Sequence, residues 1–87
     1  MTEQEIKQII DNIFMEEFEI DASKITPEAE IFGTLGLDSL DIVDLVVALE
    51  KAFGVKIKSR ESLQHIRTVG DIYKFIISQA ENKDKIV

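Results

Sequence analysis

Cysteine and tryptophan are absent from this chain of 87 residues, which has one histidine and one proline. Without cysteine there is no disulfide framework, no thiolate nucleophile and no cysteine ligand for zinc. A serine nucleophile needs a base and a group that orients this base. The single histidine, His65, follows Ser39 by 26 positions and falls in a different predicted helix. We therefore do not expect the chain to catalyse a reaction itself.

Long apolar runs are also missing. No stretch approaches the length of a membrane span, and the N-terminus lacks the basic start and apolar segment of a signal peptide. Apolar residues make up 45% of the chain and charged residues 31%, a balance typical of a folded protein. We expect one soluble, cytoplasmic and monomeric domain over residues 1–87, with an ordered core over about 3–80 and a frayed tail at 81–87.

Basic residues are scarce in the first half of the chain. Residues 1–50 hold 13 acidic and 2 basic residues, whereas residues 51–87 hold 4 acidic and 8 basic ones. The basic cluster at Lys56, Lys58 and Arg60 has no aromatic residues between its members, so nucleic acid is not an expected partner. No spacing of carboxylates fits a calcium loop, and no metal site is expected. The acidic half predicts a partner with a basic docking surface.

Helix signals mark the first and second predicted helices. Thr2 and Glu5 have the spacing of a capping box, and isoleucines follow them at helical intervals up to a predicted end near Phe18. A second helix is predicted over Ser39 to Phe53, with Gly54 in the usual position after a helix C-terminus. The connection between the two helices, from Glu19 to Asp38, is long enough to need apolar anchors. The expected anchors are Ile20, Ile25, Ile31, Phe32 and Leu35.

Two further helices complete the predicted fold. A short helix is expected around Ser59 to His65, and another begins at Thr68, where Thr68 and Asp71 have the spacing of a capping box. The pattern predicts an all-α fold, a small four-helix bundle with a long loop between helices 1 and 2 and a short third helix.

Apolar residues lie on two sides of the second predicted helix. One arc is expected to face the core, and it contains Ile42, Leu45, Val46, Leu49, Ala52 and Phe53. Leu40, Val43 and Val47 form a second stripe, which would be explained either by a helix that is covered on all sides or by a docking surface. Three other short helices cannot surround this one, so the pattern favours docking.

The residues at the start of this helix carry most of the functional information. Ser39 follows a glycine-containing loop and has Asp38 before it and Asp41 two positions after it. A helix N-terminus presents unpaired N–H groups and the positive end of the helix dipole, so a phosphate diester could be held here. The same residues also fit an ordinary helix cap, with Asp38 at the N-cap. Capping and attachment are compatible, because Asp38 can cap while the Ser39 hydroxyl points outward.

The string Gly36-Leu37-Asp38-Ser39-Leu40, followed by an acidic and apolar helix, resembles the acyl carrier proteins. The resemblance extends from about Glu3 to Ala80. It implies that Ser39 carries a 4′-phosphopantetheine arm, transferred from coenzyme A by holo-acyl-carrier-protein synthase, a phosphopantetheinyl transferase. It also implies that Asp38 helps this enzyme to place its magnesium and coenzyme A.

By the same resemblance, the second helix is the recognition helix for partner enzymes with basic docking surfaces that transfer or process acyl groups. The expected docking residues are Leu37, Leu40, Asp41, Val43, Asp44, Val47 and Glu50. A core that opens to shelter an acyl chain would be lined by Phe32, Ile42, Leu45, Ala48, Leu49, Ile57 and Ile66. The chain departs from the family pattern where Lys51 and Ala52, rather than further acids, follow Glu50 and where Leu37 replaces a small residue.

The predicted function is therefore to carry acyl intermediates as thioesters and to present them to enzymes of fatty-acid or related lipid or polyketide biosynthesis. Two alternatives stay open. An aminoacyl or peptidyl carrier would share the arm, although Gly36-Leu37-Asp38 fits the acyl type better. An unmodified helical adaptor would use the stripe at Leu40, Val43 and Val47 alone.

Overall fold

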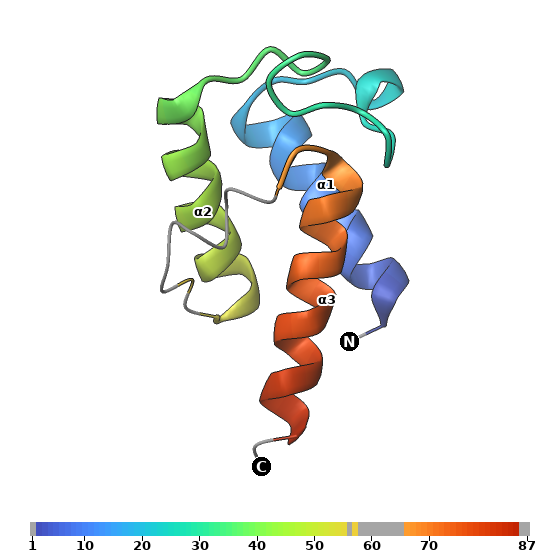
Figure 1. Cartoon of the computed structure of the whole chain (residues 1–87), viewed down its shortest axis with the longest axis vertical. Coiled ribbons are helices and arrows are strands. Elements are labelled where there is room, and N and C mark those ends of the chain that lie inside the picture. Colours follow the sequence, from blue (N-terminus) through green and yellow to red (C-terminus); the bar gives the residue numbers. More distant parts are fainter. Residues whose placement is uncertain (1, 56, 58–65, 86–87) are drawn as a thin grey trace.

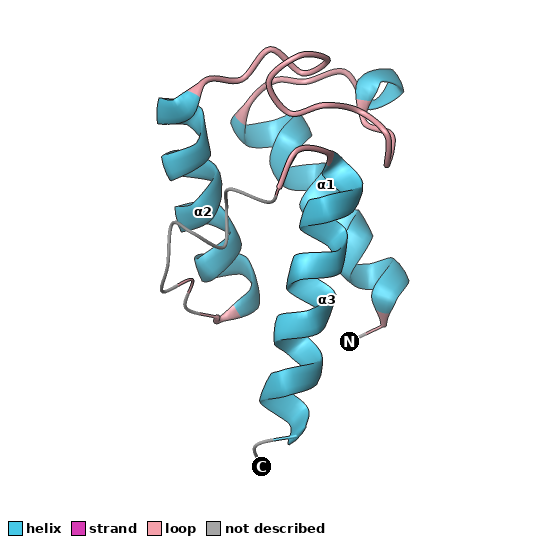
Figure 2. Cartoon of the chain, in the orientation of Figure 1, coloured by secondary structure: helices cyan, strands magenta, loops and turns pink. Residues whose placement is uncertain are grey.

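A computed structural model describes residues 2–55, 57 and 66–85, with residues 80–85 described by their backbone (Figure 1). Within these ranges the chain forms α1 (Glu3–Glu17), α2 (Ser39–Phe53) and α3 (Val69–Lys85), with a short 3-10 helix, η1 (Ala22–Lys24), between α1 and α2. Helices and loops make up all of the described part (Figure 2), which confirms the all-α class. The predicted short helix over 59–65 lies outside the described residues. None of the described helices has the length and apolar character needed to cross a membrane.

The capping signals read from the sequence are confirmed at the starts of α1 and α3. The Thr2 hydroxyl accepts a hydrogen bond from the Glu5 N–H at 3.1 Å, and the Glu5 carboxylate accepts from the Thr2 N–H at 3.1 Å. Before α3, Thr68 and Asp71 exchange the same pair of bonds at 3.2 and 3.1 Å. The N–H of Arg67 also donates to the Asp71 carboxylate, and these donors hold the pKa of Asp71 below its usual value.

The C-terminal ends of α1 and α2 also agree with the prediction. Helix α1 ends at Glu17, with Phe18 as its C-cap. Gly54 ends α2 in a left-handed conformation (φ 63°), and its N–H donates to the Glu50 carbonyl at 2.9 Å. Glycine adopts this conformation without a steric penalty. Helix α3 continues to Lys85, past the predicted limit of the ordered core near residue 80. The fraying of residues 81–87 stays a prediction.

The core lies where α1 packs against both α2 and α3 (Figure 1). Its most completely buried side chains are Ile10, Phe14, Ile31, Val69, Ile72 and Ile76. Leu45 and Leu49 bury the predicted core face of α2, and Ile42, Val46 and Phe53 are half-buried. Ala52 is exposed, so its assignment to the core was wrong. It lies in the last turn of α2, and its single methyl group extends less far from the helix than the buried Leu45 and Leu49 side chains do.

A polar contact joins α3 to α1 at the edge of this core. The Tyr73 hydroxyl donates a hydrogen bond to the Asp11 carboxylate, and the Lys7 ammonium lies 5.7 Å from the centre of the Tyr73 ring. Burial, followed by the bond to Asp11, raises the pKa of Tyr73 well above its usual value. The hydroxyl therefore stays protonated and can donate throughout the physiological pH range.

The long connection is anchored by its side chains and by backbone hydrogen bonds to the start of α3. Ile20 and Ile31 are buried and Ile25 and Leu35 are half-buried, as expected, but Phe32 is exposed. Three hydrogen bonds of 2.9–3.0 Å tie the connection to residues 67–70. They join Ile31 N–H to the Arg67 carbonyl, Val69 N–H to the Ala29 carbonyl and Gly70 N–H to the Pro27 carbonyl. An isolated bridge pairs Glu30 with Thr68. The prediction for Phe32 was wrong because residues 31–34 form a turn, in which Ile31 is buried against the core and Phe32 is left exposed.

Candidate functional site

The N-terminus of α2 is capped by side chains of its own first turn. Asp38 has an extended backbone, and its Oδ1 accepts hydrogen bonds from the N–H groups of Leu40 and Asp41, both at 3.0 Å. In return, Oδ2 of Asp41 accepts from the Asp38 N–H at 3.0 Å. The capping interpretation is therefore confirmed. Each carboxylate uses one oxygen for the cap, and within the described residues its second oxygen has no hydrogen-bond partner.

Ser39 is the first residue of α2, and it is exposed. Its hydroxyl makes no hydrogen bond to any of the described residues, and the cap does not depend on it, since Asp38 accepts from the N–H groups of Leu40 and Asp41. Ser39 also lies at the positive end of the α2 helix dipole, which favours a negatively charged substituent. The arrangement fits a phosphodiester on the Ser39 oxygen, since the substituent would displace no existing contact.

The loop before Ser39 is fixed to the core. Gly36 has a positive φ of 72°, a conformation that strains other residues, and no atom lies within 4 Å of where its Cβ would be. The next residue, Leu37, donates its N–H to the Ile31 carbonyl at 3.1 Å, and its side chain is 9% exposed. Leu37 was expected among the docking residues, but this side chain belongs to the core and anchors the loop two residues before Ser39.

The second apolar stripe of α2 is exposed as expected. Leu40, Val43 and Val47 are 75%, 49% and 43% exposed. Asp44, which flanks the stripe, is exposed, and Asp41 is half-buried at the cap. Glu50 is also half-buried, and its carboxylate accepts a hydrogen bond from the Ile57 N–H at 3.1 Å. This acid therefore has a structural role that the sequence did not indicate: it ties the end of α2 to the segment after Gly54.

Comparisons with known proteins agree with this geometry. Residues 8–76 match the family model described as the phosphopantetheine attachment site. The chain is 49% identical over 72 residues to "Acyl carrier protein 2" of Ralstonia nicotianae, a match that covers 83% of this chain and 88% of the relative. It is 46% identical over 67 residues to "Acyl carrier protein" of Helicobacter pylori, covering 77% and 85%. This chain belongs to the acyl carrier protein family.

Membership of this family establishes the kind of activity. Acyl carrier proteins are carriers rather than enzymes, and their cofactor is a covalently attached 4′-phosphopantetheine. They work with enzymes that synthesise and process the carried group. The expectation from the sequence, a carrier without catalysis of its own, is confirmed at this level.

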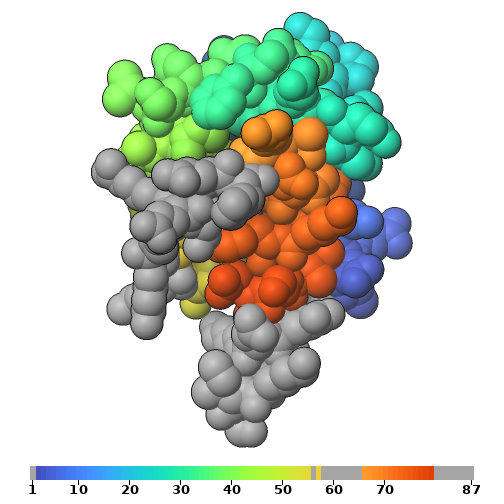
Figure 3. Space-filling model, viewed as in Figure 1, coloured from blue at the N-terminus to red at the C-terminus, as the bar shows by residue number. Residues whose placement is uncertain are grey.

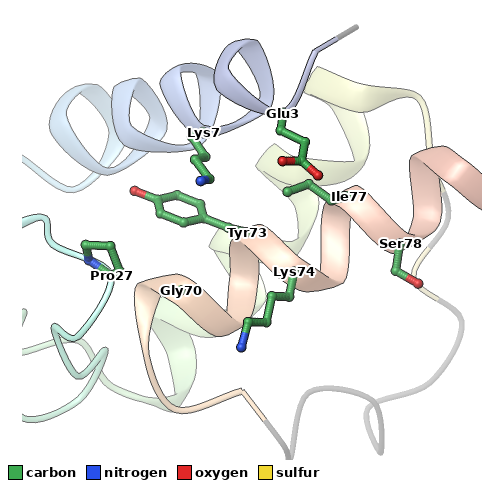
Figure 4. A pocket seen from close by; sticks show the side chains of 8 residues that line it. All are labelled: Glu3, Lys7, Pro27, Gly70, Tyr73, Lys74, Ile77 and Ser78. Carbon is green, nitrogen blue, oxygen red and sulfur yellow. The ribbon is translucent and has the colours of Figure 1, made fainter.

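The residues expected to line an acyl-chain pocket lie mainly in the core beside α2. Leu45 and Leu49 are buried, Ile42, Ile57 and Ile66 are half-buried and pack against the core, and Ala48 is half-buried. Phe32 is separate from this group, because its side chain is exposed. A hollow of about 390 Å³ lies elsewhere, between α1 and α3 (Figure 4). This hollow is not the predicted pocket, because none of the residues that line it comes from α2. The lining residues are Glu3, Lys7, Pro27, Gly70, Tyr73, Lys74, Ile77 and Ser78.

Proposed function

We propose that Ser39 carries the 4′-phosphopantetheine arm of this acyl carrier protein. A phosphopantetheinyl transferase would join the Ser39 oxygen to the phosphorus of coenzyme A that bears the pantetheine. The pyrophosphate P–O bond would break, adenosine 3′,5′-bisphosphate would leave, and the hydroxyl proton would be released. The observation that carries this proposal is the exposed Ser39 hydroxyl at the start of α2, without a hydrogen-bond partner among the described residues and beside a complete cap. The free second oxygen of Asp38 supports a contact with the magnesium and coenzyme A of the transferase.

Partner enzymes would dock on the outer face of α2. Leu40, Val43 and Val47 supply exposed apolar area next to Ser39, and Asp44 supplies an exposed negative charge beside it. Asp41 and Glu50 would contribute through the carboxylate oxygens that their internal bonds leave available. A partner with a basic rim and an apolar centre fits this surface.

The carried acyl chain would enter the core beside α2. Ile42, Leu45, Ala48 and Leu49 lie on the inner side of the helix, and Ile57 and Ile66 come from the segments that follow it. Widening of this region would require α2 to move, since these side chains are already in contact with the core. The proposed cargo is an acyl intermediate of fatty-acid or related lipid or polyketide biosynthesis, carried by a monomeric cytoplasmic domain.

The mass of the intact protein tests this proposal. The chain is produced in a bacterial host with an active phosphopantetheinyl transferase, and its mass is compared with that of the unmodified sequence. A gain of one phosphopantetheine supports the carrier. An unchanged mass would favour the helical adaptor, which uses the stripe on α2 without any modification. An aminoacyl group found on the arm of protein isolated from its own cells would instead identify an aminoacyl carrier.

Charge and apolar area on α2 should affect different steps of docking. Asp44→Lys is expected to slow association with the transferase several-fold at low salt, with the effect fading as salt rises, because rim charges act mainly on the on-rate. Leu40→Ser should instead speed dissociation, since it removes apolar contact area. Both rates are measurable by stopped-flow or surface-based binding. Asp44 is the better acid for this test than Asp38 or Asp41, since reversal at either of those two would also remove the cap.

Glu16→Lys provides the matched control, because Glu16 is an exposed acid on α1 and the substitution changes the net charge equally. A similar slowing by Glu16→Lys would show that net charge alone steers the partner. Equal rates for Asp44→Lys and the wild type at low salt would contradict docking on this face.

A further inference from the structure

Phe32 is an exposed aromatic residue on a turn that is held firmly in place. Its side chain is 54% exposed, whereas its neighbour Ile31 is completely buried. The Glu30 carbonyl accepts from the N–H groups of Thr34 and Leu35, both at 2.9 Å. The Thr34 hydroxyl accepts from the Glu30 N–H at 3.1 Å. Because the backbone on both sides of Phe32 is fixed by these bonds, its outward position belongs to the fold and is not the result of a loose loop.

The same turn brings Phe32 close to Ser39. The hydrogen bond from Leu37 N–H to the Ile31 carbonyl, 3.1 Å long, places the start of the turn against a residue two positions before Ser39. With ordinary bond lengths and a fully extended path from Leu37 to Ser39, the Cα atoms of Phe32 and Ser39 lie within about 15 Å of each other. The connection and the N-terminus of α2 also form one continuous surface at the same end of the molecule (Figures 1 and 3).

A partner that works on Ser39 would cover this distance. A standard protein interface buries about 800 Å² on each side, which corresponds to a disc of roughly 16 Å radius. Phe32 falls within such a disc centred on Ser39, and so do Leu40 and Asp38. Aromatic residues, phenylalanine included, are enriched at the centres of protein interfaces, because they bury a large area with few rotatable bonds.

We propose that Phe32 is a docking anchor for the phosphopantetheinyl transferase, on the connection and separate from the stripe on α2. The chemistry of the surface fits a partner with an apolar pocket rimmed by basic side chains, since the exposed acids Glu30 and Asp38 lie in the same part of the chain as Phe32. The inference rests on the proposed role of Ser39 and adds a second element to its recognition. It also has Phe32 contact the transferase, whereas this side chain was expected from the sequence to line the acyl-chain pocket.

The test is the kinetics of loading with coenzyme A by a purified phosphopantetheinyl transferase, with the unmodified full-length chain as the varied substrate. Phe32→Ala should raise the KM for the chain by about fivefold or more, while kcat stays within about twofold, because the contact is made equally before and during transfer. Phe32→Leu should restore most of the affinity. Gln4→Ala is the matched control, since it removes a neutral, exposed side chain in the first turn of α1. The KM of this variant should equal that of the wild type.

The melting temperatures of these variants distinguish an effect on docking from an effect on folding. The Tm of Phe32→Ala is expected to equal that of the wild type. An unchanged KM for Phe32→Ala would overturn the proposal. If the KM is unchanged and acylation raises the Tm of the wild type but not that of Phe32→Ala, Phe32 contacts the acyl chain, which also overturns the proposal. Failure of the wild-type chain itself to be loaded would contradict the role of Ser39, a result distinct from either of these.

Discussion

Ser39→Ala is expected to abolish loading with phosphopantetheine and to leave the fold intact. The substitution removes the one hydroxyl in the first turn of α2, and it leaves the cap in place because the Asp38 carboxylate, not Ser39, accepts the bonds from Leu40 and Asp41. The free energy of unfolding should change by no more than about 1 kcal/mol, because an exposed hydroxyl without partners contributes little. Incorporation of labelled coenzyme A and the mass of the intact protein measure loading, and circular dichroism measures the fold.

Ser23→Ala is the matched control for this variant. Ser23 is an exposed serine in η1, and its backbone N–H, which the substitution keeps, donates to the Asp21 carboxylate at 2.9 Å. The Ser23 variant should be loaded at the wild-type rate. Loading of Ser39→Ala to the wild-type extent would place the arm on another residue and remove the basis for the docking proposals.

Ile31→Ala is expected to have the largest effect on stability among changes near the site. The Ile31 side chain is completely buried, and truncation of a buried isoleucine typically costs about 2–5 kcal/mol. For a domain of this size each kcal/mol lowers Tm by roughly 4–8 °C, so the fall should be about 10 °C or more. The backbone bonds of Ile31 to Arg67 and Leu37 make it the point where α3, the connection and the loop before Ser39 meet.

Phe32→Ala is a stringent comparison for Ile31→Ala, because Phe32 is the next residue in the chain and its side chain is larger than that of Ile31. Thermal denaturation followed by circular dichroism should give nearly the wild-type Tm for Phe32→Ala and a much lower one for Ile31→Ala. Equal losses at the two positions would mean that Phe32 also contributes to the core, contrary to its exposure.

The starts of α1, α2 and α3 and the ends of α1 and α2 could be predicted from the sequence because their signals are local. The Thr2–Glu5, Asp38–Asp41 and Thr68–Asp71 pairs each act within a single turn, and Gly54 ends α2 by its own conformation. Ser39 could be placed for the same reason, since its neighbours determine its position at a helix start. The exposed stripe on α2 followed from helical periodicity together with the small number of helices available to cover it.

The assignments that failed depend on contacts between distant parts of the chain. Whether Ile31 or Phe32 points inward is decided by the pairing of the connection with residues 67–70, which no local pattern announces. Leu37 was expected among the docking residues from the family resemblance, but its hydrogen bond to Ile31 and its burial attach it to the core. The docking role of Glu50 stays a prediction, and the structure adds a bond from a backbone N–H seven residues later that the sequence did not indicate.

The cap of α2 has a mechanical consequence for a carrier whose core opens. The bonds between Asp38 and Asp41 lie entirely within the first turn of the helix, and left-handed glycines, Gly36 and Gly54, stand before and after α2. The connection, by contrast, is bonded to the start of α3. If α2 swings outward to admit a chain, its first turn travels with it as a rigid body. The orientation of a group on Ser39 relative to the outer face of α2 is then the same in the empty and the filled carrier, so a partner that binds α2 alone meets one geometry whatever the cargo.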